Sequence, residues 1–165
     1  MEPPESIDGR WDADTLRELE NLYEPLRRFA AMVGRWEVEP DDLVQEAYAR
    51  FLKAEPRAVR DLGPYLRRVI ANAAIDERRR SRRAEAARLR IATDAKTADT
   101  YPSELADLLR LDPQVRGLLY LVEVEGESVT AAARVVGMGP ASARMALTRA
   151  RRRLRAELEA ERDDD

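Results

Sequence analysis

The residues best suited to chemistry in this 165-residue chain are arginines, which gather in two short segments. Five of the six residues from Arg78 to Arg83 are arginine, and a second basic segment runs from Arg144 to Arg155. Guanidinium groups match phosphate oxygens in geometry and charge, so such clusters indicate a polyanionic partner. The net charge is nevertheless -3, because acidic residues are concentrated elsewhere in the chain. An arginine-rich composition that happens to accumulate at a frayed helix end is the alternative explanation.

Residue types that make and break bonds are scarce. The chain has no cysteine and no histidine, which excludes disulfides, thiol nucleophiles, imidazole bases and the usual zinc ligand sets. Its carboxylates lie on predicted helix faces and in a terminal run rather than as a pair placed for acid–base work. We therefore predict a protein that is not an enzyme and needs no metal or cofactor. The absence of long apolar runs and of a signal-like start predicts a cytoplasmic protein without membrane insertion.

Hydrophobic periodicity predicts the fold class. Apolar residues recur at helical spacing in almost every segment, and no segment alternates as a strand does. We predict an all-α chain of two small helical domains joined by a flexible linker, whose composition lacks a sustained apolar stripe. The predicted parts are a disordered start at 1–14, a first domain at 15–83, the linker at 84–103, a second domain at 104–160 and an acidic tail at 161–165.

The first domain is predicted to contain three helices. One runs from Thr15 to Val33, a second opens at Pro40, and a third follows a loop and has Pro64 in its first turn. On the second helix, acidic and amide side chains share the arc opposite the apolar one: Asp41, Asp42, Gln45 and Glu46. By pattern alone this arc is either a solvated face, with acids well placed near the helix N-terminus, or a surface for a partner.

The third helix carries a polar stripe at three- and four-residue intervals, made of Arg68, Asn72, Asp76 and Arg79. The stripe leads directly into the arginine cluster, which therefore lies at the C-terminal end of this helix. Positive side chains are favourable there because of the helix dipole. That effect accounts for one or two arginines, not for five.

The second domain has the pattern of a helix-turn-helix. Ser128 is a natural N-cap for a helix from Val129 to Val136, and Gly137 and Gly139 flank a tight turn into a long basic helix that begins at Pro140. The side chains expected on the outer face of this helix are Ser142, Arg144, Met145 and Thr148, followed by Arg149, Arg151 and Arg152 at positions suited to phosphates. An ordinary helical hairpin is the alternative.

Three segments carry a resemblance to a known family. They are DDLVQEAYARFLKA, PYLRRVIANAAIDERRRSRR and DPQVRGLLYLVEVEGESVTAAARVVGMGPASARMALTRARRRL. Together they resemble the extracytoplasmic-function (ECF) group of the sigma-70 family, the compact bacterial initiation factors that keep only sigma regions two and four. The resemblance extends from about Leu16 to Leu158, with the segments in the family's order and a linker between the halves.

The resemblance implies an alternative sigma factor, which binds core RNA polymerase and directs promoter-specific initiation by recognising minus-35 and minus-10 elements and stabilising the melted non-template strand. In the family the DLVQE helix docks on the clamp helices of the largest polymerase subunit. This makes Asp41, Asp42, Gln45 and Glu46 candidate core-binding residues. The flap region of the polymerase, promoter DNA and an anti-sigma factor are the other partners that the resemblance implies.

Residues for promoter contact follow from the same resemblance. The candidates for the minus-10 element are Arg57, Arg60, Arg68, Asn72, Asp76, Arg78, Arg79, Arg80, Arg82 and Arg83. The candidates for the minus-35 element are Ser142, Arg144, Met145, Thr148, Arg149, Arg151 and Arg152. Three departures put minus-35 reading in question: Ala146 replaces a second base-reading residue of the family, and Ala131 and Ala132 replace acidic residues of the supporting helix.

A helix-turn-helix regulator that never acts as an initiation subunit is the alternative function. Such a protein uses only the C-terminal half on duplex DNA. It gives no reason for an acidic DLVQE face followed by a basic helix in the first half.

Overall fold

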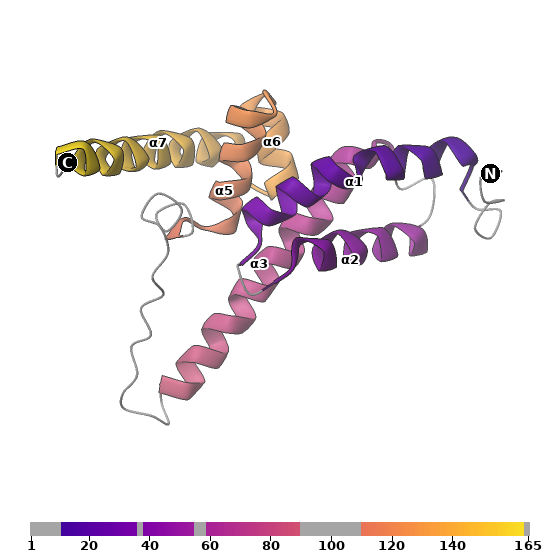
Figure 1. Ribbon diagram of the computed structural model, residues 1–165, viewed down its shortest axis with the longest axis horizontal. Helices are drawn as coiled ribbons and strands as arrows, with labels where there is room; N and C mark the ends of the chain where they lie inside the picture. Colours follow the sequence, from indigo (N-terminus) through magenta and orange to yellow (C-terminus); the bar gives the residue numbers. More distant parts are fainter. Residues whose placement is uncertain (1–10, 36–37, 55–58, 90–109, 164–165) are drawn as a thin grey trace.

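The computed structural model describes residues 11–35, 38–54, 59–89 and 110–163, and no strand occurs in these ranges. The helices are α1 (Ala13–Val33), α2 (Pro40–Lys53), α3 (Leu62–Leu89), α5 (Pro113–Leu119), α6 (Val129–Val136) and α7 (Pro140–Asp163), and a π-helical turn η3 (Tyr120–Val124) follows α5. The predicted all-α fold is confirmed (Figure 1). None of the described helices is both long and apolar enough to cross a lipid bilayer.

Helices α1, α2 and α3 pack together around large apolar side chains. Phe29 and Phe51 are completely buried, and the ring of Trp11 lies 4.1 Å from that of Phe51, measured between ring centroids. The start of α1 is capped by Asp12, whose carboxylate accepts a hydrogen bond from the backbone N–H of Thr15 at 2.8 Å. This bundle fixes the directions of α2 and α3, the two helices of the first half that carry candidate site residues.

The second half forms the predicted helix-turn-helix from α6 and α7. The side chain of Ser128 caps α6 by accepting from the N–H of Ala131, and Gly137 ends the helix in the left-handed conformation with φ of 71°. A side chain with a Cβ adopts that conformation only at a cost, so glycine suits the turn. The turn at Gly137 leads from α6 into α7, which extends well beyond this unit (Figure 1).

The two halves share one continuous apolar core in this structure. Helix α5 packs on α1, and α6 packs on α3. Phe29 of α1 meets Tyr120 of η3, with ring centroids 6.1 Å apart. The C-terminal half of α3 projects away from this body (Figure 1). The body therefore holds the halves against each other, while α3 and α7 each extend beyond it.

Several predicted boundaries shift in the structure. We expected residues 1–14 to be disordered, yet Trp11 is buried and α1 begins at Ala13. Helix α3 continues to Leu89, past the start predicted for the linker, because residues 84–89 contain no helix breaker. Helix α7 likewise continues to Asp163, into the predicted acidic tail. The rest of the predicted linker and the apolar segment after it, up to residue 109, lie outside the described residues.

Candidate polymerase and nucleic-acid interfaces

Helix α2 presents an acidic face to solvent. Asp42, Gln45 and Glu46 are exposed, as expected, while the apolar side chains of the helix face α1 and α3. Glu46 forms an exposed ion pair with Arg50 one turn later, at 2.5 Å, and such surface pairs contribute little to stability. The face is therefore open to a basic partner.

Asp41 differs from the other acids of this face because it joins α2 to α1. The hydroxyl of Tyr23 donates a hydrogen bond to its carboxylate at 2.5 Å, and Arg27 lies 3.2 Å away. The hydrogen bond from Tyr23 is the main cause that lowers the pKa of Asp41, and the positive charge of Arg27 adds to it. Of the four predicted core-binding residues, Asp41 thus has a structural role already.

The polar stripe of α3 is exposed along its whole length. Arg68, Asn72, Asp76 and Arg79 all face solvent, and Arg60 is exposed just before the helix. Arg79 lies 3.9 Å from Asp76, which is a loose contact between two well-exposed side chains. The stripe is free of the core and can meet a nucleic-acid strand. Arg57, which was predicted to belong to the same surface, lies outside the described residues.

The arginine cluster divides into an outward and an inward part. The outward members are exposed and lie on the projecting end of α3: Arg79, Arg80, Arg82 and Arg83. Arg78 points back to the body, where it forms an ion pair with Asp112 at 2.6 Å and donates to the carbonyl oxygen of Leu111 at 3.2 Å. The predicted five-arginine surface is therefore a four-arginine surface in this conformation.

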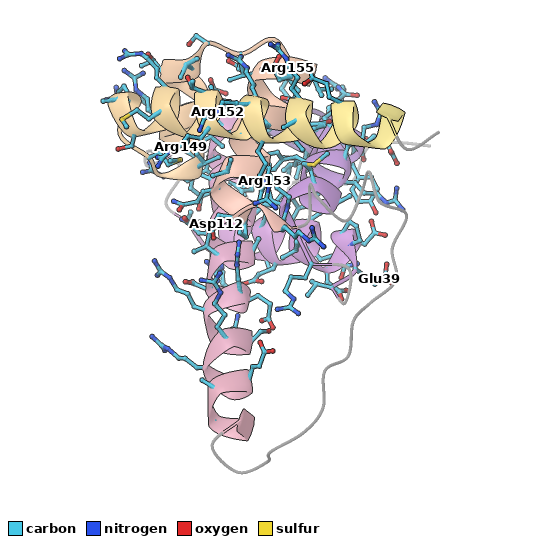
Figure 2. All side chains as sticks on the ribbon, turned by 90° about the vertical axis from the view of Figure 1, so that its left-hand side faces the viewer. Glu39, Asp112, Arg149, Arg152, Arg153 and Arg155 are labelled. Atoms are coloured by element: carbon cyan, nitrogen blue, oxygen red, sulfur yellow. The ribbon has the colours of Figure 1, made fainter. Side chains whose placement is uncertain are left out.

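Helix α7 presents its predicted reading face to solvent. Ser142, Arg144, Met145 and Thr148 are exposed, and Met145 is 61% exposed, which is unusual for a large apolar side chain. The labelled arginines Arg149, Arg152, Arg153 and Arg155 follow along the same helix (Figure 2). Another candidate, Arg151, forms an ion pair with Glu123 at 2.5 Å.

Ala146 lies on the inner side of α7 and not on its exposed face. Its side chain is only 8% exposed and packs inward together with Leu147 and Ala150. Its side chain thus faces the body of the protein in this structure, and the effect of this alanine on minus-35 reading stays a prediction. Ala132 is likewise completely buried, and Ala131 is half-buried.

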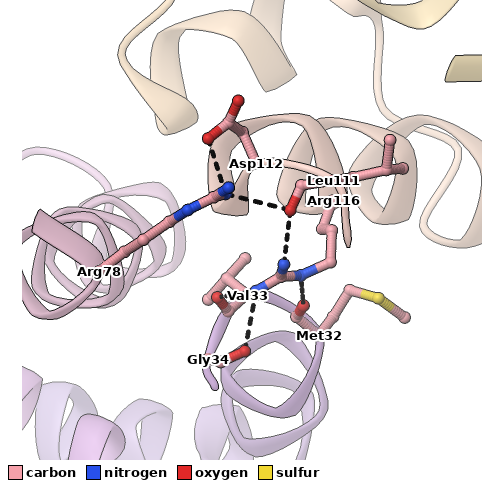
Figure 3. Close-up of polar contacts among 7 residues, drawn as sticks. All are labelled: Met32, Val33, Gly34, Arg78, Leu111, Asp112 and Arg116. Carbon is pink, nitrogen blue, oxygen red and sulfur yellow. Dashed lines mark hydrogen bonds and ion pairs between the residues drawn. The ribbon is translucent and has the colours of Figure 1, made fainter. Parts of the chain in front are cut away.

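A buried arginine that the sequence did not reveal lies where the halves meet. Arg116 of α5 is 3% exposed and donates hydrogen bonds to backbone carbonyl oxygens at the end of α1 (Figure 3). Burial lowers its pKa to about 10, and the nearby charge of Arg78 contributes, so the side chain is still cationic at neutral pH. Its position in the helical pattern resembles that of a surface residue, and no local signal marks it as buried.

A comparison with family models identifies the first half of the chain. Residues 19–84, which cover α2 and most of α1 and α3, match the model described as sigma-70 region 2. This part of the chain is therefore similar to region 2 of the sigma-70 family. A region of this kind indicates a sigma factor that directs transcription initiation, and the polar surfaces of α2 and α3 both lie inside the matched residues.

A solved structure extends the likeness in fold to the second half of the chain. One similar structure is the co-crystal structure of the sigma factor RpoE in complex with the anti-sigma factor NepR from Bartonella quintana. The TM-score is 0.67 at 22% sequence identity, and the match covers 90% of this chain and 98% of that chain. At this identity the match establishes a common fold through both halves. The search of curated proteins finds no match.

Proposed function

We propose that this chain is an alternative sigma factor of the ECF group that acts in the cytoplasm on core RNA polymerase. It docks through the acidic face of α2 and contacts promoter DNA through α3 and α7. The observation that supports this most is the separation of charge in the first half. Acidic groups on α2 and basic groups on α3 are both exposed, and among the described residues no ion pair joins the two surfaces.

The docking step follows from the geometry of α2. Asp42, Gln45 and Glu46 provide two carboxylates and an amide on one exposed face. Complementary charge on a partner speeds encounter and fixes orientation more than it raises affinity. We assign this face to the clamp helices of the largest polymerase subunit, with Asp41 holding α2 in place against α1. We assign contact with the flap region of the polymerase to the second half of the chain.

The promoter steps need positioning and no bond chemistry. On α3, Arg68 and Asn72 contact the unpaired strand of the minus-10 element, and the outward arginines beyond them bind phosphates of the adjoining duplex. On α7, Ser142 and Arg144 reach base edges of the minus-35 element, where each good base contact contributes about 1–3 kcal/mol of discrimination. Strand separation costs stacking energy, which these contacts offset.

An anti-sigma protein is a further proposed partner. The fold match is to a sigma factor that was crystallised with an anti-sigma factor, and the match includes both halves of the chain. A regulator that contacts both halves can hold α2, α3 and α7 away from polymerase and DNA together.

A transcription assay tests the main proposal. The full chain is mixed with core polymerase, and promoter-specific run-off RNA is measured together with co-elution of the two. We expect both RNA and co-elution. Absence of both overturns the proposal and leaves a helix-turn-helix regulator as the function.

Charge reversal tests the docking face. Asp42→Lys combined with Glu46→Lys is expected to weaken binding to core polymerase by at least about tenfold while leaving binding to a minus-35 duplex unchanged. The matched control is Glu18→Lys with Glu20→Lys, because both of these glutamates are exposed on α1. Equal core affinity for the two double variants contradicts the assignment of this face.

A further inference from the structure

Two large apolar side chains are strongly exposed in the part of the chain that the structure describes. Met145 of α7 is 61% exposed, and Val124 of η3 is 67% exposed. Exposure of a single apolar side chain does not by itself define a site. The surroundings of each side chain therefore decide what it can contact.

Charge distinguishes the two positions. Val124 lies in an acidic turn, between Glu123 and Glu125. Met145 lies in the stretch of α7 from Pro140 to Ala156, which contains six arginines and no acidic residue. An excess of positive charge raises the local concentration of a polyanion. Nucleic acid is therefore drawn to the surface around Met145, and the surface around Val124 has no such excess.

Helix geometry places Met145 close to the outermost line of α7. The buried side chains on the inner arc of this helix are Ala143, Ala146, Leu147 and Ala150. At about 100° per residue, Met145 and Thr148 each lie about 150° from the centre of that arc, one on either side of the direction that points straight out. Ser142 and Arg144 lie on the two flanks, about 90° and 110° from the same centre. When a helix of this kind enters the major groove, its outermost line points at the base edges.

The side chains along this outermost line present methyl groups. Ala141 is exposed one turn before Met145, and the Met145 sulfur is only a weak hydrogen-bond acceptor. The hydroxyl of Thr148 donates to the backbone carbonyl oxygen of Arg144 at 2.9 Å, so the methyl group of Thr148 is left for a partner. The apolar feature of the base edges in the major groove is the C5-methyl group of thymine. The line is therefore suited to that group.

We propose that Met145 reads a thymine of the minus-35 element through the 5-methyl group of the base. The inference rests on the proposed function and names the base feature that this position of α7 recognises. Ser142 and Arg144 supply hydrogen bonds on either side of the contact. The unbranched thioether adapts its shape to a methyl group, and burial of one methyl group changes affinity by about fourfold. Met145 thus adds selectivity, while the arginines supply most of the affinity.

Replacing thymidine by deoxyuridine tests the contact, because this change removes only the 5-methyl group. The full chain first selects its best duplex from a pool that is randomised at its centre, and each thymine of that duplex is then replaced in turn. We expect the wild-type chain to lose about fourfold in affinity at a single thymine. Met145→Ala is expected to bind the thymine and deoxyuridine duplexes equally well. Met145→Leu keeps an apolar side chain of similar volume and is expected to keep most of the difference.

Two further variants separate the methyl contact from other causes. Val124→Ala removes the other exposed apolar side chain and is expected to keep the full difference between the two duplexes. Thr148→Ser keeps the hydroxyl that bonds to the backbone and removes the methyl group. A difference that is lost in Thr148→Ser and kept in Met145→Ala assigns the reading to Thr148 and overturns the proposal. Helix content from circular dichroism is compared for every variant.

Methylated cytosine gives an independent readout of the same contact. At the position of the sensitive thymine, a duplex with cytosine is compared with a duplex that has 5-methylcytosine, so the two again differ by one methyl group. The wild-type chain is expected to bind the methylated duplex about fourfold more tightly. Met145→Ala is expected to bind both equally. Equal binding by the wild-type chain contradicts a contact with the methyl group.

The remaining outcomes also decide the question. A wild-type chain that responds to no thymine methyl group overturns the proposal, and so does a full difference in Met145→Ala. A pool from which the chain selects no duplex overturns it as well, because α7 then reads no bases. Methyl sensitivity without run-off RNA rejects the sigma assignment alone. Run-off RNA without methyl sensitivity rejects the methyl contact alone.

Discussion

Replacing the outward arginines of α3 by alanine is expected to change how DNA binding depends on salt. The four residues are exposed on the projecting end of the helix: Arg79, Arg80, Arg82 and Arg83. At about 100° per residue they span an arc of about 160°, so one side of a duplex can meet all four. Arg78 is not counted, because Asp112 holds it against the body.

The magnitude follows from counterion release. Each phosphate that the protein neutralises on duplex DNA contributes about 0.9 to the slope of log affinity against log salt concentration, so four contribute about 3.6. Between 50 and 200 mM salt, a fourfold increase, this slope corresponds to roughly a 150-fold loss of affinity. The alanine variant is expected to lack that part of the salt dependence.

Fluorescence anisotropy with a labelled duplex measures the slope of log affinity against log salt concentration for the wild-type protein and for the alanine variant across this range of salt. A variant with lysine at the same four positions is the control, because lysine keeps the charge and should keep the slope. Equal slopes for the wild-type and alanine proteins refute the reasoning, since the four arginines then make no phosphate contacts. A lysine variant that loses as much slope as the alanine variant refutes it too, because charge is then not the cause.

Three further predictions concern the scaffold. Ser128→Ala removes the cap of α6 and is expected to lower the free energy of unfolding by about 1 kcal/mol, measured by urea denaturation. Phe29→Ala empties a completely buried site and is expected to cost about 3–5 kcal/mol in the same measurement. The lowered pKa of Asp41 means that its bond with Tyr23 stabilises the fold above the ordinary pKa of the carboxyl group and loses this effect as pH falls through the lowered pKa. Wild type and Tyr23→Phe are therefore expected to differ in stability at neutral pH and to converge in strong acid.

Local signals in the sequence were enough to predict several helix ends. Ser128 and Gly137 bound α6 as their side-chain chemistry dictates, and Pro40 opens α2. The exposed faces of α2, α3 and α7 were predictable as well, because helical spacing separates apolar from polar side chains on one helix. These are short-range properties, and each depends on a few neighbouring residues.

Contacts between distant segments were not predictable in the same way. Arg116 has no unusual neighbours in sequence, and its role depends on α1, more than 80 residues earlier. Arg78 was counted with its neighbouring arginines because nothing local shows that Asp112 lies beside it. Ala146 was assigned from the family's pattern, although its burial depends on how α7 packs. The extension of α3 to Leu89, by contrast, could have been predicted, because the residues after Arg83 are good helix formers.

Helix α3 is uninterrupted, so it keeps a fixed distance between the side chains along its length. Asn72 and Arg83 are 11 positions apart (83 − 72) with no glycine or proline between them, a separation of about 16 Å at 1.5 Å per residue, or close to five base pairs of duplex. In the proposed function, the residue that contacts the unpaired strand and the arginine that binds the duplex are thus kept at one spacing. A single inserted residue would turn everything beyond it by about 100° and aim the distal arginines elsewhere, so the length of this stretch is constrained as tightly as its composition.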